Sequence, residues 1–196
     1  PPADQTLQAQ LEALFVNNAD FDRLAQALKR FNPIRVMKME RMEIRHSAIL
    51  AWLLDPSETH GMGDQFLKAF LAEAFRGTNV HPNALMITQS DLRDAEILRE
   101  KKNMDLFVTA PSLGWAFVIE NKLGSRQHSN QLKRYSDNAK KIAASQGKEF
   151  QSRGIFLTLE DEALMDKDKP DYVPLRYYQL CTILRDLVQR LGAGLD

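Results

Sequence analysis

The chain is poor in the residues that form disulfides and metal-thiolate sites. Its 196 residues include one cysteine, Cys181, and four histidines that are scattered along the sequence. A lone cysteine cannot form an internal disulfide, and the spacing of these residues matches no zinc-ligand pattern. We therefore expect no structural zinc or disulfide, and a reducing cytoplasm is the simplest setting for such a chain.

Long apolar runs and an excess of charge of either sign are also absent. No apolar stretch reaches the length of a membrane-spanning helix, and the first residues lack the basic-then-apolar order of a signal peptide. With 44% hydrophobic and 27% charged residues, the composition is that of a globular domain with a core. Because 26 basic residues balance 26 acidic residues, the surface as a whole has no strong attraction for nucleic acid.

The order of the periodic patterns predicts an α/β domain. Apolar residues at helical spacing predict helices over 7–16, 21–31, 38–54, 62–75, 129–145 and 180–191. Short apolar runs between turn formers predict strands over 85–88, 95–100, 104–110, 115–121, 154–159 and 172–177. We expect a central mixed sheet flanked by helices in a single domain, with residues 1–36 as a helical N-terminal extension and residues 37–191 as the core.

Two of these runs predict a hairpin, because the turn-forming segment 111–114 separates them. If Ala110 pairs with Trp115, the antiparallel register places Asp105 directly opposite Glu120 on the same face. One additional loop residue would break that geometry, so the register is a hypothesis.

The end of the second run suits a metal site for phosphate chemistry. Two carboxylates that face each other repel unless a cation lies between them. The carboxylates of Asp105 and Glu120 with the carbonyl of Asn121 would suit Mg²⁺, for which Mn²⁺ could substitute. Lys122 projects from the same face as Glu120 and could orient an attacking water or hold a phosphate oxygen. A solvated strand end is the alternative interpretation, because an E-x-K tripeptide is common.

Basic residues gather in the segment that follows this run. Between residues 121 and 153 the acidic residues are only Asp137 and Glu149. The basic residues there are Lys122, Arg126, Lys133, Arg134, Lys140, Lys141, Lys148 and Arg153. Arg126 and Lys133 are candidates for contact with substrate phosphates, and a solvated charged face is the alternative.

Two predicted helices carry further candidates. Gln131 and Tyr135 are four residues apart, so they share one helix face that would look back at the strand ends. Glu43, His46 and Ser47 share a face of an earlier helix in the same way. Ordinary surface or core positions are the alternative for both sets.

These elements together resemble the PD-(D/E)XK nuclease superfamily, which has the restriction-endonuclease-like fold. The resemblance runs from about Glu43 to Tyr135. It includes an E-x-x-H-S signature that starts at Glu43 and is similar to one bacterial branch of the superfamily. It also includes a Q-x-x-x-Y element that starts at Gln131 and is similar to that of exonuclease-related members. Met104 departs from the pattern, since the superfamily's name has proline at that position.

The resemblance implies a role for each matching residue. Asp105 and Glu120 would be metal ligands, and Lys122 would be the catalytic lysine. Glu43 matches an acidic residue on the first core helix that helps to bind metal or to orient the site. The Q-x-x-x-Y element would lie beside the active site and contact the substrate.

The function expected from these residues is that of a metal-dependent nuclease that hydrolyses DNA phosphodiester bonds with Mg²⁺. Two alternatives stay open. One is a catalytically silent member of the same fold that acts as a nucleic-acid or protein interaction module, and the other is a different Mg²⁺-dependent phosphotransfer enzyme. The expected partner is DNA. A homodimer stays open, because double-strand cutting by this fold commonly needs two active sites. An additional protein partner also stays open, and no membrane is expected.

Overall fold

The computed structural model describes residues 7–12, 19–20, 23, 26, 31–99, 105–123, 151–159 and 172–192. The chain divides into two units, Pro1–Glu40 and Arg41–Asp196. In the first unit, residues 7–12 are helical and a short helix, α3, spans Pro33–Val36. Asn32 caps α3, because its side chain accepts a hydrogen bond of 3.2 Å from the backbone N–H of Arg35.

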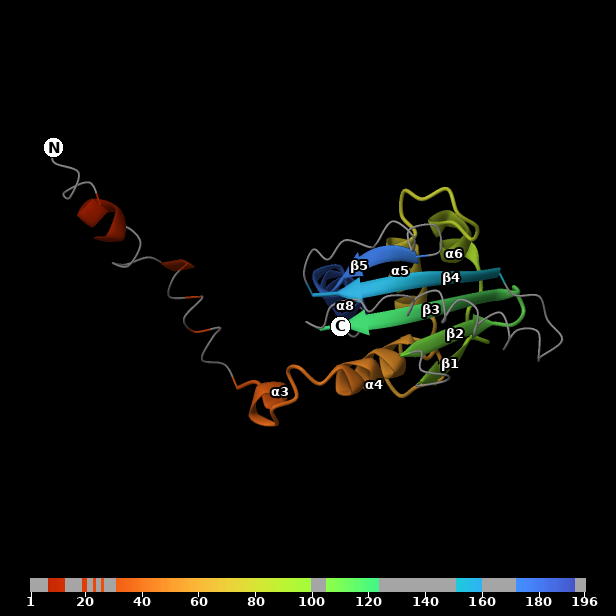
Figure 1. The fold of residues 1–196 in the computed structure, drawn as a ribbon, viewed down its shortest axis with the longest axis horizontal. Coiled ribbons are helices and arrows are strands. Elements are labelled where there is room, and N and C mark those ends of the chain that lie inside the picture. The colour runs from red at the N-terminus through yellow and green to blue at the C-terminus, as the bar shows by residue number, and fades with distance from the viewer. Residues whose placement is uncertain are drawn as a thin grey trace, which may run out of the picture. The chain divides into compact units, whose positions relative to one another are not determined.

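A five-stranded mixed sheet forms the centre of the second unit (Figure 1). Its strands are β1 (Glu96–Arg99), β2 (Leu106–Ala110), β3 (Trp115–Lys122), β4 (Gln151–Thr158) and β5 (Tyr172–Arg176). They lie side by side in chain order, with antiparallel pairing from β1 to β3 and parallel pairing from β3 to β5. The predicted α/β fold with a mixed sheet is therefore confirmed.

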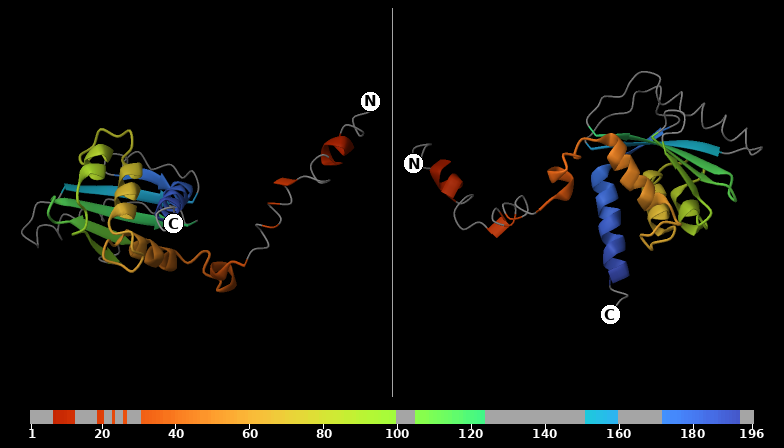
Figure 2. Two further views of the ribbon diagram at one scale, coloured as in Figure 1. Left: turned by 180° about the vertical axis from the view of Figure 1, so that it is seen from behind. Right: turned by 90° about the horizontal axis from the view of Figure 1, so that it is seen from below.

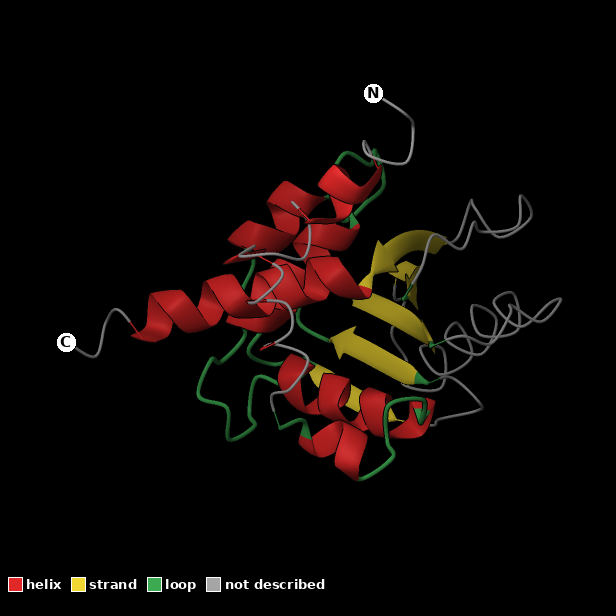
Figure 3. Cartoon of the chain, turned by 90° about the vertical axis from the view of Figure 1, so that its left-hand side faces the viewer, coloured by secondary structure: helices red, strands yellow, loops and turns green. Residues whose placement is uncertain are grey.

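The described helices of this unit cover one face of the sheet (Figures 2 and 3). They are α4 (Glu43–Leu54), α5 (Gln65–Ala74), α6 (Ala84–Gln89) and α8 (Tyr177–Gly192). The core between these helices and the sheet includes Leu54, Phe66 and Phe70 from the helices and Phe117 and Ile155 from the strands. Burial of this apolar surface is the main stabilising contribution and holds the strands in a fixed position against the helices.

The β2–β3 hairpin has the predicted register. Ala110 pairs with Trp115, and the ladder continues to Leu106 opposite Ile119. The turn between the strands ends at Gly114, whose φ of 65° lies in the left-handed region that glycine adopts without strain. The next step of this register brings Asp105 to the level of Glu120, as the hairpin model required.

One predicted element differs from the structure in type, and others differ in where they begin. Residues 85–88 were predicted as a strand but lie in α6, because Asn83 caps a helix there by accepting a hydrogen bond from the Met86 N–H. The helix predicted over 38–54 begins only at Glu43, after Lys38 adopts a φ of 54° that no helix contains. The helix predicted from residue 180 begins three residues earlier, directly after β5. None of the described helices is both long and apolar enough to cross a membrane.

Candidate active site

The carboxyl end of β3 carries a buried ion pair. Glu120 and Lys122 project from the same face of the strand, and Lys122 Nζ lies 2.8 Å from Glu120 Oε1. Glu120 is fully buried and Lys122 is 7% exposed. Two charged groups at such a depth are expensive to desolvate, which makes this strand end a candidate functional site.

Asp105 reaches this end of β3 from the neighbouring strand. It immediately precedes β2, and its Oδ2 accepts a hydrogen bond of 2.9 Å from the backbone N–H of Asn121. The bond ties the carboxylate to the residue that lies between Glu120 and Lys122. The hairpin therefore brings together three of the predicted residues, Asp105, Glu120 and Lys122.

Glu43 joins the group from the helix layer. It is the first residue of α4, and its Oε1 accepts a hydrogen bond of 3.0 Å from the backbone N–H of Leu123, the residue after β3. This contact fixes the start of α4 to the end of the strand. The charge of Glu43 also raises the pKa values of Glu120 and Lys122, which places it within electrostatic range of the pair.

Two carboxylates of this cluster, those of Asp105 and Glu120, have raised pKa values. Burial, and after it the charge of Asp105, raises the pKa of Glu120 to about 7, although Lys122 partly opposes the shift. Burial also raises the pKa of Asp105, against the stabilising hydrogen bond from Asn121. Among the described residues of the cluster, three carboxylates accompany one ammonium group, so a further cation would stabilise Asp105 and Glu120 in their ionised form.

Lys122 remains a cation in this environment. Burial by itself lowers its pKa, but the hydrogen bond and charge of Glu120, with the charges of Glu43 and Asp105, outweigh burial and leave the pKa raised. The ammonium group is therefore protonated at neutral pH. It can donate hydrogen bonds and attract an anion, and it is not a general base in this state.

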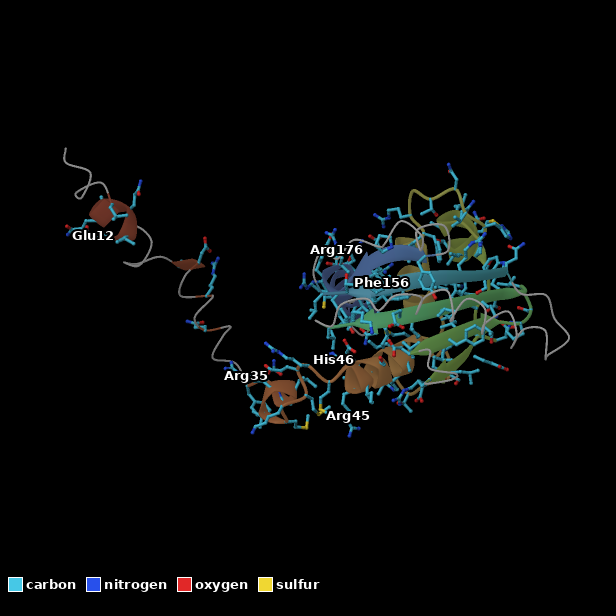
Figure 4. The ribbon with its side chains drawn as sticks, viewed as in Figure 1. Glu12, Arg35, Arg45, His46, Phe156 and Arg176 are labelled. Atoms are coloured by element: carbon cyan, nitrogen blue, oxygen red, sulfur yellow. The ribbon has the colours of Figure 1, made fainter. Side chains whose placement is uncertain are left out.

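The side chain of Asn121 points to the opposite face of β3, toward the helices. Its Nδ2 donates a hydrogen bond of 3.0 Å to Ser47 Oγ of α4, and its Oδ1 accepts one of 2.7 Å from the phenol of Tyr177 at the start of α8. Asn121 is fully buried, and its bond to Ser47 is shielded from water, whereas the bond from Tyr177 is partly buried. His46, on the first turn of α4 (Figure 4), makes an edge-to-face contact with the Tyr177 ring, with centroids 6.3 Å apart.

Tyr177 was not among the predicted site residues. The pattern of residues 172–177 placed it at the end of a strand, whereas it is the first residue of α8. The structure marks the true helix start with one half of a capping box, because the side chain of Gln179 accepts a hydrogen bond from the backbone N–H of Arg176. The sequence carries only part of this signal, since Arg176 occupies the position where the motif has serine or threonine.

The remaining candidates, Gln131, Tyr135, Arg126 and Lys133, lie outside the described residues. Their proposed contacts with substrate therefore stay predictions. The arrangement described above depends on none of them.

Comparison with known proteins agrees with this arrangement. Residues 31–193 match the family model of the PD-(D/E)XK nuclease superfamily. The chain belongs to this superfamily. No curated protein and no solved structure matched the chain. The five-stranded mixed sheet with helices against it is consistent with the PD-(D/E)XK fold, and members of the superfamily act on nucleic acids and typically use a divalent metal ion.

The donor chemistry of the site fits the ion that PD-(D/E)XK enzymes use. Within the described part of the chain, no group of three or more histidine, cysteine, aspartate or glutamate side chains is arranged to hold a metal by itself. Mg²⁺ does not need such a cage, because it is commonly bound through one or two carboxylates and retains several waters. Asp105 and Glu120 supply oxygen ligands of this kind, and burial is the main cause that raises the pKa of each.

Proposed function

We propose that the protein is a metal-dependent nuclease that hydrolyses DNA phosphodiester bonds. The observation that carries this proposal is the junction of Asp105, Glu120 and Lys122 at one strand end, with Glu43 beside it, in a chain of the PD-(D/E)XK superfamily. A cluster made only for stability would gain from apolar residues of similar size, since buried charges are expensive to desolvate. The four charged groups are better explained by chemistry on a phosphate.

Asp105 and Glu120 would hold the ion, with the backbone carbonyl of Asn121 as a third oxygen ligand. A bound Mg²⁺ supplies positive charge to the phosphate and lowers the pKa of a coordinated water. Two hydrogen bonds support this part of the site. The Asn121 N–H orients the carboxylate of Asp105, and Glu43 holds the backbone of Leu123 just beyond the strand.

Lys122 would act on the substrate rather than on the ion. Its ammonium group carries a full positive charge at neutral pH, because the nearby carboxylates raise its pKa. One of its N–H groups contacts Glu120 in the ion pair. Its other N–H groups can donate hydrogen bonds to a phosphate oxygen or to the attacking water. Placed in this way, Lys122 stabilises the negative charge that develops on the phosphate during attack.

The test is a cleavage assay on linear duplex, circular duplex and single-stranded DNA, and on RNA, with Mg²⁺, Mn²⁺ or EDTA. The wild-type protein should cut DNA only with metal, and Lys122→Ala should lose at least a hundredfold in rate, as happens when an electrostatic group of an active site is removed (on the order of 10²–10³). Lys122→Met is a second variant, which retains the apolar stem of the side chain in case the alanine variant is unstable.

Lys68→Ala is the matched control. Nζ of Lys68, a residue of α5, lies 2.8 Å from Oδ2 of Asp64, the residue before that helix, so this variant loses a lysine–carboxylate pair of the same length away from the site. Its cleavage rate should equal that of the wild type. Wild-type protein that is folded but cuts no substrate would overturn the proposal. Binding without cutting would instead indicate an interaction module, and phosphate release from a nucleotide would indicate a phosphotransfer enzyme.

A further inference from the structure

A row of polar side chains crosses three strands at the carboxyl edge of the sheet. In the parallel register, Lys122 of β3 pairs with Thr158 of β4, and Thr158 pairs with Arg176 of β5. Each of them is the last residue of its strand. The row therefore starts at the candidate catalytic lysine and runs away from Asp105, which lies on the other side of β3.

All three side chains of the row project from the face that carries Glu120. Leu157 and Leu175, the residues that precede Thr158 and Arg176, belong to the core beneath the helices. Because successive residues of a strand point to opposite faces, Thr158 and Arg176 point away from the helices, as Lys122 does.

Arg176 is the member of the row that is most accessible to a ligand. Lys122 and Thr158 are 7% and 4% exposed, whereas Arg176 is only partly buried. Figure 4 labels Arg176 at the end of β5. Neighbouring strands lie about 4.8 Å apart, so the Cα atoms of Lys122 and Arg176 are separated by about 10 Å.

The backbone of Arg176 is held firmly. β5 continues into α8 without a loop, and the Arg176 N–H donates a hydrogen bond of 3.0 Å to Gln179 Oε1. Gln179 in turn donates one of 2.9 Å from Nε2 to Glu73 Oε1 of α5. A functional side chain on such a rigid junction has a defined position, which suits a binding role better than a place on a loop.

Negative and positive side chains lie at opposite sides of this edge of the sheet. The carboxylates of Asp105 and Glu120 lie at the β2–β3 side, and the guanidinium of Arg176 lies at the β5 side. An arginine fork matches the geometry of a phosphate group and binds it through two parallel hydrogen bonds. A nucleic-acid strand that crosses the strand ends would therefore meet a metal site first and a phosphate-binding group next.

We propose that Arg176 binds a backbone phosphate of the substrate that neighbours the phosphate at Lys122. The proposal rests on the proposed nuclease function, since it takes Lys122 to mark the phosphate that is attacked. In this arrangement Arg176 is a substrate-binding residue that fixes how the strand lies across the site, and it has no part in holding metal.

The test compares wild type, Arg176→Gln and Arg176→Lys in binding a short labelled DNA duplex and its single strand over a series of salt concentrations. Ca²⁺ replaces Mg²⁺ in this assay to occupy the oxygen ligands. Arg176→Gln should bind about tenfold more weakly, as expected for one charged hydrogen-bonded contact. The slope of log affinity against log salt should fall by about 0.9 for duplex or about 0.7 for single-stranded DNA, the value for one phosphate contact. Arg176→Lys should restore the slope but only part of the affinity.

Arg185→Gln is the matched control, because Arg185 is an exposed arginine further along α8 and the charge change is the same. It should bind like the wild type. In cleavage assays with Mg²⁺, Arg176→Gln should raise KM with little change in kcat. The substitution leaves the backbone bond to Gln179 in place, so the thermal unfolding midpoint should stay close to that of the wild type.

The outcomes separate this proposal from the nuclease function. A wild-type salt slope in Arg176→Gln, with cleavage intact in the wild type, would overturn the role of Arg176 and leave the nuclease. A reduced slope in a protein that never cuts would support the phosphate contact and overturn the nuclease. Wild-type protein that binds no DNA would overturn both.

Discussion

The phenol of Tyr177 donates a hydrogen bond of 2.7 Å to Asn121 Oδ1, and this bond joins the first turn of α8 to the strand end that carries Glu120 and Lys122. The Nδ2 of the same amide group donates a hydrogen bond to Ser47 of α4. Two helices thus hold the residue whose backbone N–H orients Asp105. Their positions affect the site through this side chain, and α4 is also tied to the strand end by the hydrogen bond that Glu43 accepts from the Leu123 N–H.

Tyr177→Phe should therefore lower both stability and activity. The change removes the donor and leaves a buried Asn121 oxygen without this partner, which costs about 1–3 kcal/mol of the free energy of unfolding. We expect cleavage to fall several-fold because Asp105 loses part of its orientation. Urea denaturation measures the first effect, and initial rates measure the second.

Tyr178→Phe is the control for this change. Tyr178 is the next residue on α8 and is 60% exposed, so loss of its hydroxyl should change neither quantity. Equal activity of Tyr177→Phe and Tyr178→Phe would mean that the contact with Asn121 is purely structural.

Asp105→Asn should weaken metal binding while the fold is retained. The amide of the new asparagine keeps an oxygen that can accept the hydrogen bond from the Asn121 N–H. It lacks the negative charge that attracts a hard cation. Calorimetric titration with Mn²⁺ should show at least a tenfold loss of affinity. Asp91→Asn, which changes an exposed aspartate paired with Arg93, should bind metal like the wild type. Unchanged affinity in Asp105→Asn would remove this residue from the site.

The hairpin that carries the site could be predicted from the sequence because its determinants are local. Two apolar runs of similar length flank a turn with Pro111 and Gly114, and few registers satisfy both runs. The predicted pairing of Ala110 with Trp115 is confirmed. The predicted mixed sheet is also confirmed, although the sequence pattern does not specify which strands are parallel.

The contacts that connect helices to the site could not be predicted in this way. Asn121 meets Ser47 and Tyr177, which are 74 and 56 residues away along the chain. The periodicity of apolar residues indicates which face of a helix or strand is buried. It does not indicate which distant polar group a buried polar side chain will contact. The helix α6 was missed for a different reason, because a short apolar run suits a strand and a helix equally well.

Gly154→Ala should destabilise the protein through a clash between neighbouring strands. Gly154 of β4 pairs with Tyr172 of β5, and a Cβ at this glycine would overlap the tyrosine ring. Tyr172 is buried, so its ring has little room to rotate away from the added methyl group. We expect a loss of about 1–3 kcal/mol in the free energy of unfolding, the usual effect of overpacking, measured by urea denaturation.

Gly192→Ala provides the comparison for this change. It is the last residue of α8 and has open space around its Cα, so the added methyl group meets nothing. Its stability should equal or exceed that of the wild type, because alanine favours the helix. The proposed clash is wrong if Gly154→Ala is as stable as Gly192→Ala.

The raised pKa of Glu120 predicts that the metal-free protein loses stability as the pH rises from about 4.5 to about 7. The folded state binds a proton at Glu120 more tightly than the unfolded state does, so this contribution is complete below pH 4.5 and is lost as the pH passes the folded pKa. The shift corresponds to about 3 kcal/mol as an order of magnitude. Urea denaturation in EDTA across this range should show a fall in the wild type.

Glu120→Gln isolates this effect, because a glutamine has no proton to lose and its unfolding free energy should change less over the same pH range. The difference between wild type and variant, rather than either curve alone, measures the contribution of Glu120. Saturating Mg²⁺ should reverse the trend for the wild type, since ion binding requires the ionised carboxylate and strengthens as the pH rises. A wild-type protein that gains stability relative to Glu120→Gln between pH 5 and pH 7 in EDTA would show that Glu120 is ionised without a metal, and that the cluster already holds enough positive charge.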